Sequence, residues 1–140
     1  MGVLVFGLLS DLLGRRVVYG SGAVLASVFV FAYFPLVDTG SWSVIVMTTA
    51  VGQAIHAMMY GPQGSFITEQ FATPVRYTGS SLAYTFASIA GGAFAPLLMT
   101  SLYQQYGTTI AVSCYVVVAL GLTLASIIAA KETAKLPLED

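Results

Sequence analysis

The side chains best suited to chemistry lie on one predicted helix face within an apolar stretch. Gln53, His56 and Tyr60 follow one another at i, i+3 and i+7, a spacing that places them on the same side of a helix. An imidazole titrates near neutral pH, so His56 could carry a proton. The alternative is that His56 is a hydrogen-bonding partner between helices. We expect this face to line a cavity, with Gln63 and Tyr84 as further candidates.

A second set of chemically capable residues is ionic. Asp11, Gly14, Arg15 and Arg16 fall within the short segment 7–16. Glycine allows a backbone turn that a side chain would block, and arginine can bind a carboxylate through two parallel hydrogen bonds. These features predict a tight loop between two helices. The alternative is a polar loop with solvated charges, because single surface ion pairs contribute little stability.

The composition shows which kind of protein must position these residues. The chain has 140 residues, of which 57% are hydrophobic and 8% charged, with mean hydropathy +0.86. A soluble domain carries about 25% charged residues, so the composition excludes a soluble enzyme. A net charge of -1 gives no basic surface for binding nucleic acid. The lone Cys114 excludes an internal disulfide. With one histidine in the chain, we expect neither a metal site nor a cofactor.

Long uncharged stretches predict an all-α, polytopic membrane protein. A spanning helix needs about 20 mostly apolar residues. Four spans fit the gaps between charges, with a polar turn over residues 103–109, and the expected spans are 17–37, 42–61, 79–102 and 110–130. Residues 1–9 are apolar but too short to cross a bilayer, so they are interpreted as the end of a fifth span. The chain therefore looks like a fragment.

The basic residues predict the orientation. With four spans, Arg15 and Arg16, Arg76, and Lys131 and Lys135 all fall on one side of the membrane. By the positive-inside rule this side is cytoplasmic. The carboxyl-terminal tail, 131–140, is then cytoplasmic.

Segment 7–16 resembles the signature cytoplasmic loop of the major facilitator superfamily. Leu12 departs from the signature, because a basic residue is usual there. The matching positions are Gly7, Leu9, Asp11, Gly14, Arg15 and Arg16. Residues 60–96 resemble the tenth and eleventh helices of the metabolite:proton symporter branch, although Ala72 and Pro74 depart from that pattern. The resemblance implies the carboxyl-terminal third of a twelve-helix transporter, from the end of helix eight to the tail.

The resemblance also implies a cytoplasmic gate. Glu69 and Arg76 match an acid/base pair of related sugar porters, and Glu132 resembles their acidic tail motif. In those relatives such charges form a network that keeps the outward-facing state closed on the inside. The gate residues implied here are Asp11, Gly14, Arg15, Arg16, Glu69, Arg76 and Glu132. The alternative is that Glu69 and Arg76 are solvated loop charges.

The third expected span contains helix-weakening residues. Gly91, Gly92 and Pro96 should weaken or kink the helix. Small residues at four-residue spacing also let helices approach closely. Two interpretations stay open, a hinge and a packing face.

The function implied by the resemblance is secondary active transport, not an enzyme activity. It would be proton-coupled symport of an organic acid or zwitterion by alternating access in the bacterial inner membrane. The partners would be the lipid bilayer, the metabolite, the proton and the amino-terminal helices of the same transporter. The alternatives are a stand-alone four-span assembly or scaffold protein without transport activity and an integral membrane enzyme, for which we find no catalytic constellation.

Overall fold

The computed structural model describes residues 2–130, and this part of the chain is helical without a strand. Four stretches are long and apolar enough to cross a membrane, namely Arg15–Asp38, Trp42–Thr68, Thr73–Tyr106 and Thr109–Ala129. The elements are α1 (Gly2–Leu13), α2 (Arg15–Asp38), α3 (Trp42–Thr68), the 3-10 turn η1 (Thr73–Val75), α4 (Arg76–Ser88), the π-helix η2 (Ile89–Phe94), α5 (Ala95–Tyr106) and α6 (Thr109–Ala129).

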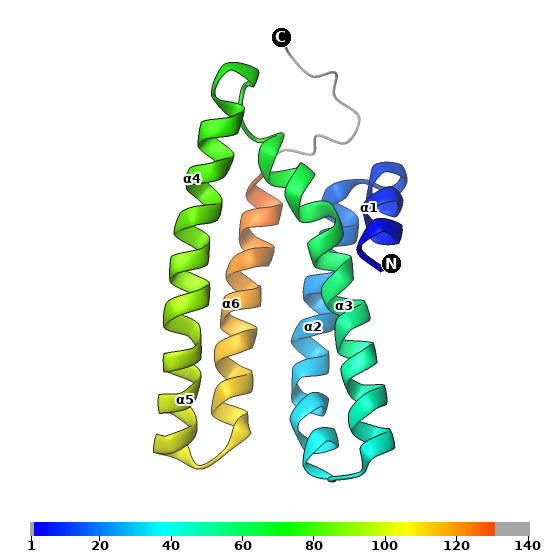
Figure 1. The fold of residues 1–140 in the computed structure, drawn as a ribbon, viewed down its shortest axis with the longest axis vertical. Helices are drawn as coiled ribbons and strands as arrows, with labels where there is room; N and C mark the ends of the chain where they lie inside the picture. The colour runs from blue at the N-terminus through cyan, green and yellow to red at the C-terminus, as the bar shows by residue number, and fades with distance from the viewer. Residues whose placement is uncertain (1, 131–140) are drawn as a thin grey trace.

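Helix α2 is central to the packing. It lies against α3 and α6, while the short α1 lies against the upper end of α3 and also contacts α2 (Figure 1). The continuous helix α4–η2–α5 stands beside α6 and joins it through a turn at the lower end. The buried apolar side chains are small in number and lie mainly along these contacts: Val18, Ala23, Ala57, Phe66, Val112 and Ile127.

Three glycines with positive φ separate the helices. Gly14 (φ 104°) divides α1 from α2, Gly40 (φ 69°) follows α2, and Gly107 (φ 63°) ends α5. The loop expected over 7–16 is wrong in its extent, because α1 stays helical to Leu13. The turn expected over 103–109 is likewise shorter, since α5 continues to Tyr106. In hydrocarbon each backbone amide needs an internal partner, so helices continue until a glycine reverses the chain.

Each range expected as a span overlaps one long helix, but α3 is longer than its expected range. It continues past residue 61 to Thr68, and Glu69 is its C-cap residue. This extension places Gln63 within α3. The upper end of Figure 1 holds the α1–α2 junction, the α3–α4 junction and the end of α6. We call it the arginine-bearing end, because Arg15, Arg16 and Arg76 belong to these junctions. The expected tail, 131–140, lies outside the described residues.

The described part of the chain leaves much apolar surface uncovered. Along α4, η2 and α5 only Ser80 is buried. Large side chains such as Phe86, Phe94 and Leu97 are more than half exposed. In water such a surface would aggregate, whereas a bilayer or further helices would cover it.

Candidate gate and cavity

The strongest ionic contact joins the beginning of α2 to the end of α3. The Arg15 Nη2 atom lies 2.8 Å from Glu69 Oε1 and 3.2 Å from Asp11 Oδ1. Gly14 ends α1, which leaves Arg15 as the first residue of α2, and the extension of α3 brings Glu69 to the same place. We call Asp11, Arg15 and Glu69 the Arg15 cluster.

The two carboxylates that contact Arg15 differ in solvent exposure. The side chains of Arg15 and Glu69 are 12% and 16% exposed, whereas that of Asp11 is 56% exposed. Removing one partner of a buried pair strands the other charge, which costs about 3–5 kcal/mol. For an exposed pair the same loss is about 0–1 kcal/mol. The Arg15–Glu69 pair therefore holds α2 to α3, and Asp11 adds little.

Two other expected gate residues, Arg16 and Arg76, donate to backbone oxygens. The Arg16 Nη2 atom donates to the backbone oxygen of Ile128 at the end of α6, at 2.8 Å. The Arg76 Nε atom donates to the backbone oxygen of Phe71, at 3.2 Å, and Arg76 forms no ion pair within residues 2–130. The role of Glu69 and Arg76 in a common charge network stays a prediction. Glu132 lies outside the described residues.

Two close approaches that the sequence interpretation missed position the cluster. A Cβ atom on Gly61 would lie 2.9 Å from both Gly7 N and Val3 O, so the backbones of α1 and α3 touch there. A Cβ atom on Gly79 would lie 2.5 Å from the ring of Phe71, which packs the α3–α4 loop on α4. Glycines at helix crossings are a known signal for close packing, and they could have indicated both contacts.

The residues expected to line a cavity lie on an exposed face of α3, and their role as a cavity lining stays a prediction. The rings of His56 and Tyr60 stack, with centroids 5.6 Å apart and planes at 23°. Both residues and Gln53 are exposed in the described part of the chain, and Gln63, further along α3, is half-buried. The face can offer a titratable ring, a phenol and an amide to a bound molecule.

Tyr84 reaches the same region from α4. A Cβ atom on Gly64 would lie 3.7 Å from the Tyr84 hydroxyl, so this hydroxyl lies over a side-chain-free position of α3. Tyr60 is one helical turn before Gly64 on α3. The structure therefore brings Tyr84 to the α3 face that carries His56.

The residues expected to weaken the third span lie in or beside the π-helix. Gly91 and Gly92 belong to η2, and Pro96 is the second residue of α5. A Cβ atom on either glycine would meet nothing within 4 Å. A side chain at either glycine would therefore be unobstructed by the described residues, and the hinge and packing interpretations both stay predictions.

Comparison with known proteins identifies the family. The family model of the Major Facilitator Superfamily matches residues 1–138. This chain belongs to the major facilitator superfamily. The resemblance inferred from segment 7–16 is confirmed, and so is the all-α polytopic membrane fold of four long helices preceded by a shorter one.

The curated relatives are metabolite transport proteins. The chain is 36% identical over 132 residues to "Inner membrane metabolite transport protein YhjE" of Escherichia coli K12, covering 94% of the chain and 30% of the relative. It is 29% identical to the "Shikimate transporter" of the same organism, and this match covers 72% of the chain and 23% of the relative. It is 31% identical to "Cis,cis-muconate transport protein" of Acinetobacter baylyi, and this match covers 69% of the chain and 22% of the relative. No solved structure matches significantly. The chain thus spans less than a third of each relative's length.

The Arg15 cluster and the α3 face with His56 differ in the chemical groups that they offer. Within residues 2–130, no group of His, Cys, Asp and Glu side chains could hold a metal ion. The available groups are one titratable ring on an open face and one buried ion pair at a helix junction.

Proposed function

We propose that this chain forms the carboxyl-terminal part of a secondary transporter that carries a small metabolite together with a proton. Its membership of the major facilitator superfamily and the names of its relatives support transport of a metabolite, and two of those names specify carboxylic acids. The substrate is an organic acid or a zwitterion. The transporter works by alternating access, in which two halves rock about a site near the membrane midplane.

The observation that carries this proposal is the Arg15–Glu69 ion pair. Alternating access needs contacts that hold one state closed and can be broken in the other. A pair at 2.8 Å with both side chains mostly buried has this property, because it is strong when formed and costly to leave half-formed. Arg15 and Glu69 are the core of the gate. Asp11, Gly14, Arg16, Arg76 and Glu132 support it.

The arginine-bearing end faces the cytoplasm in this proposal. Arg15, Arg16 and Arg76 lie there, and the turns at Gly40 and Gly107 at the opposite end carry no basic residue. The positive-inside rule then places the carboxyl terminus in the cytoplasm of a bacterium whose inner membrane holds the transporter.

The α3 face supplies the cavity and the proton site. His56 carries the coupled proton, because an imidazole ring can bind and release a proton. Gln53, Tyr60, Gln63 and Tyr84 contribute hydrogen bonds to the substrate. The missing walls of the cavity come from the other helices of the transporter.

The test is uptake by the full-length transporter in proteoliposomes, with shikimate and cis,cis-muconate as first probes. An imposed inward proton gradient should drive accumulation, and a protonophore should abolish it. His56→Gln keeps hydrogen bonding but removes the titration, so accumulation should fall while exchange of internal and external substrate survives. Tyr60→Phe keeps both the ring and His56, so it should change accumulation and exchange by the same factor.

Two results would contradict the proposal. Accumulation by His56→Gln equal to wild type at every pH would remove His56 from coupling. Stable insertion of the full-length protein, with no uptake of any carboxylate or zwitterion, would favour the assembly or scaffold alternative.

A further inference from the structure

Phe71 lies in the loop between α3 and α4 and makes three contacts there. Its backbone N–H donates to Thr68 O at 3.3 Å, and its backbone oxygen accepts from Arg76 Nε at 3.2 Å. Its ring lies against α4, where a Cβ atom on Gly79 would be 2.5 Å from the ring Cδ1 atom. Glu69 precedes Phe71 by two residues. The three contacts therefore connect the beginning of α4 to the acid of the gate's ion pair.

The contact of the Phe71 ring with Gly79 is the tightest of the three. A Cβ atom on Gly79 would also lie 2.7 Å from Cε1 and 2.9 Å from Cγ of the ring. The Cγ atom does not move when the ring turns about its own axis, so a methyl group at Gly79 would displace the whole side chain or the loop backbone. The two hydrogen bonds, at 3.2 Å and 3.3 Å, are long for N–H to oxygen contacts. Gly79 therefore determines where Phe71 lies.

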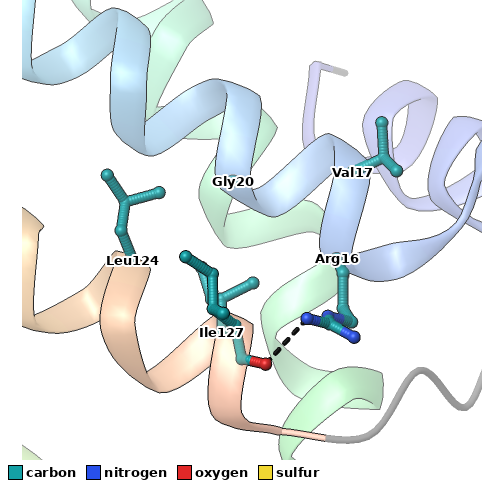
Figure 2. A pocket seen from close by; sticks show the side chains of 6 residues that line it. Arg16, Val17, Gly20, Leu124 and Ile127 are labelled. Atoms are coloured by element: carbon teal, nitrogen blue, oxygen red, sulfur yellow. Dashed lines mark hydrogen bonds between the residues drawn. The ribbon is translucent and has the colours of Figure 1, made fainter.

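The two partners of the gate's ion pair are anchored differently. On the Arg15 side, the adjacent Arg16 donates to Ile128 O at 2.8 Å and so ties the beginning of α2 to α6 (Figure 2). On the other side, Glu69 is the C-cap residue of α3 and continues directly into the loop that contains Phe71. The pair's atoms lie 2.8 Å apart, so a loop displacement of about 0.5–1 Å would take them out of hydrogen-bond range.

We propose that Phe71 is a positioning residue of the gate, which holds Glu69 opposite Arg15 and makes their ion pair depend on the place of α4. Arg76 takes part through its Nε–H group, which binds Phe71 O, and not through its charge. A displacement of α4 that carries Phe71 with it then separates Glu69 from Arg15. This inference rests on the proposed function, because the ion pair must open and close during transport for such a displacement to gate the transporter.

The experiment is a double-variant cycle on the Tm of the purified full-length transporter, without substrate or gradient, so its outcome does not depend on transport. Glu69→Gln should lower the Tm because the ion pair is lost. Gly79→Ala displaces Phe71 and weakens the pair beforehand, so in this background Glu69→Gln should lower the Tm about twofold less. The matched control is Gly64→Ala, whose Cβ atom would make an ordinary contact with the Tyr84 hydroxyl at 3.7 Å, and here the full effect of Glu69→Gln should persist.

An equal Tm decrease in the Gly79→Ala and wild-type backgrounds would overturn the proposal, because loop packing that is independent of the ion pair gives additive effects. Phe71→Leu removes the ring and leaves room at Gly79, so it keeps the test decisive if Gly79→Ala does not fold. It should reduce the effect of Glu69→Gln in the same way. Its matched control is Phe94→Leu, an aromatic position in η2 that is 58% exposed, where the effect should stay complete.

Two variants of Arg76 separate its hydrogen bond from its charge. Glutamine carries its Nε2 donor at the same number of bonds from the backbone as arginine carries Nε, so Arg76→Gln keeps a donor for Phe71 O without the charge. Arg76→Leu removes both. The Tm effect of Glu69→Gln should persist in Arg76→Gln and shrink in Arg76→Leu. An equal reduction in both would show that the charge acts and would overturn the role proposed for Arg76. Gating itself is tested by uptake, so a failure of positioning and a failure of gating give different results.

Discussion

Arg15 illustrates how burial decides which of two contacts matters. Its guanidinium contacts the carboxylates of Glu69 and Asp11 at 2.8 Å and 3.2 Å, distances that differ little. Only Glu69 is mostly shielded from solvent. A low local dielectric strengthens the attraction and also raises the cost of leaving either partner alone. Loss of Glu69 should therefore matter far more than loss of Asp11.

A charge swap tests the pair in the full-length transporter. Arg15→Glu and Glu69→Arg should each slow initial uptake strongly, because each leaves two like charges in a partly buried position. The double variant restores opposite charges and should recover part of the rate through a coupling energy of about 0.5–3 kcal/mol. Recovery stays incomplete because the planar fork of arginine is not mirrored from the other side.

The control for the swap is Asp11→Asn. This variant removes the exposed partner, so its effect should correspond to about 0–1 kcal/mol. Initial uptake rates are compared at matched membrane abundance. Additive losses in the double variant would show that Arg15 and Glu69 do not share a gate.

The sequence indicates partners for charged side chains better than partners for backbone groups. Arg15 and Glu69 could be assigned to one gate in advance because both carry a charge and both match a family motif. The contacts of Arg16 with Ile128 O and of Arg76 with Phe71 O could not, since a backbone oxygen has no residue-type signature.

Among the helices, the contact of α1 with α3 depends on one missing side chain. Gly61→Ala would place a Cβ atom 2.9 Å from Gly7 N and Val3 O, so α1 must move. Such overpacking costs about 1–3 kcal/mol. The Tm of the purified full-length protein should fall.

Gly64→Ala is the matched control for that change. Its Cβ atom would meet only the Tyr84 hydroxyl at 3.7 Å, an ordinary contact. Alanine stabilises a helix relative to glycine by about 0.5–1 kcal/mol, so the Tm should stay or rise. Equal Tm shifts in the two variants would contradict the close approach of α1 and α3.

The π-helix η2 is the element most suited to flex. Gly91→Ala with Gly92→Ala meets no steric obstacle, and neither glycine has a positive φ. The alanines restrict the backbone, so we expect unchanged or higher Tm together with slower uptake if η2 bends during the cycle. Gly121→Ala in α6 also has open space and should leave uptake unchanged. Wild-type uptake in the η2 variant would remove the hinge.

Helix existence was predictable, but helix ends were not. The uncharged stretches from Arg16 to Asp38, from Asp38 to Glu69 and from Arg76 to Lys131 indicate long apolar segments directly. The polar residues of 7–13 and 103–106 suggested loops, yet they remain helical because backbone hydrogen bonding outweighs side-chain polarity near a bilayer. The π-helix has no distinctive signature beyond its two glycines.

Two exposed faces of the described chain need other groups to cover them. The continuous helix Thr73–Tyr106 buries only Ser80 within the described residues, and the α3 face with Gln53, His56 and Tyr60 is exposed. Lipid can cover the apolar part, but a polar face in hydrocarbon needs partners or water. The match to the relative from Escherichia coli K12 covers 94% of this chain but 30% of that protein. In a transporter of that length, further helices can supply those partners.

Residues 1–140 by themselves should therefore not move a metabolite across a membrane. A rocking mechanism requires two halves that enclose the substrate, and one open face cannot seal alternately to either side. The measurement is uptake of shikimate and cis,cis-muconate by proteoliposomes that contain residues 1–140 alone, with the full-length transporter at equal protein content as the positive control. Protease protection verifies insertion of the shorter chain. Gradient-driven uptake above that of empty liposomes would show that the four helices suffice, and the requirement for an opposing half would be wrong.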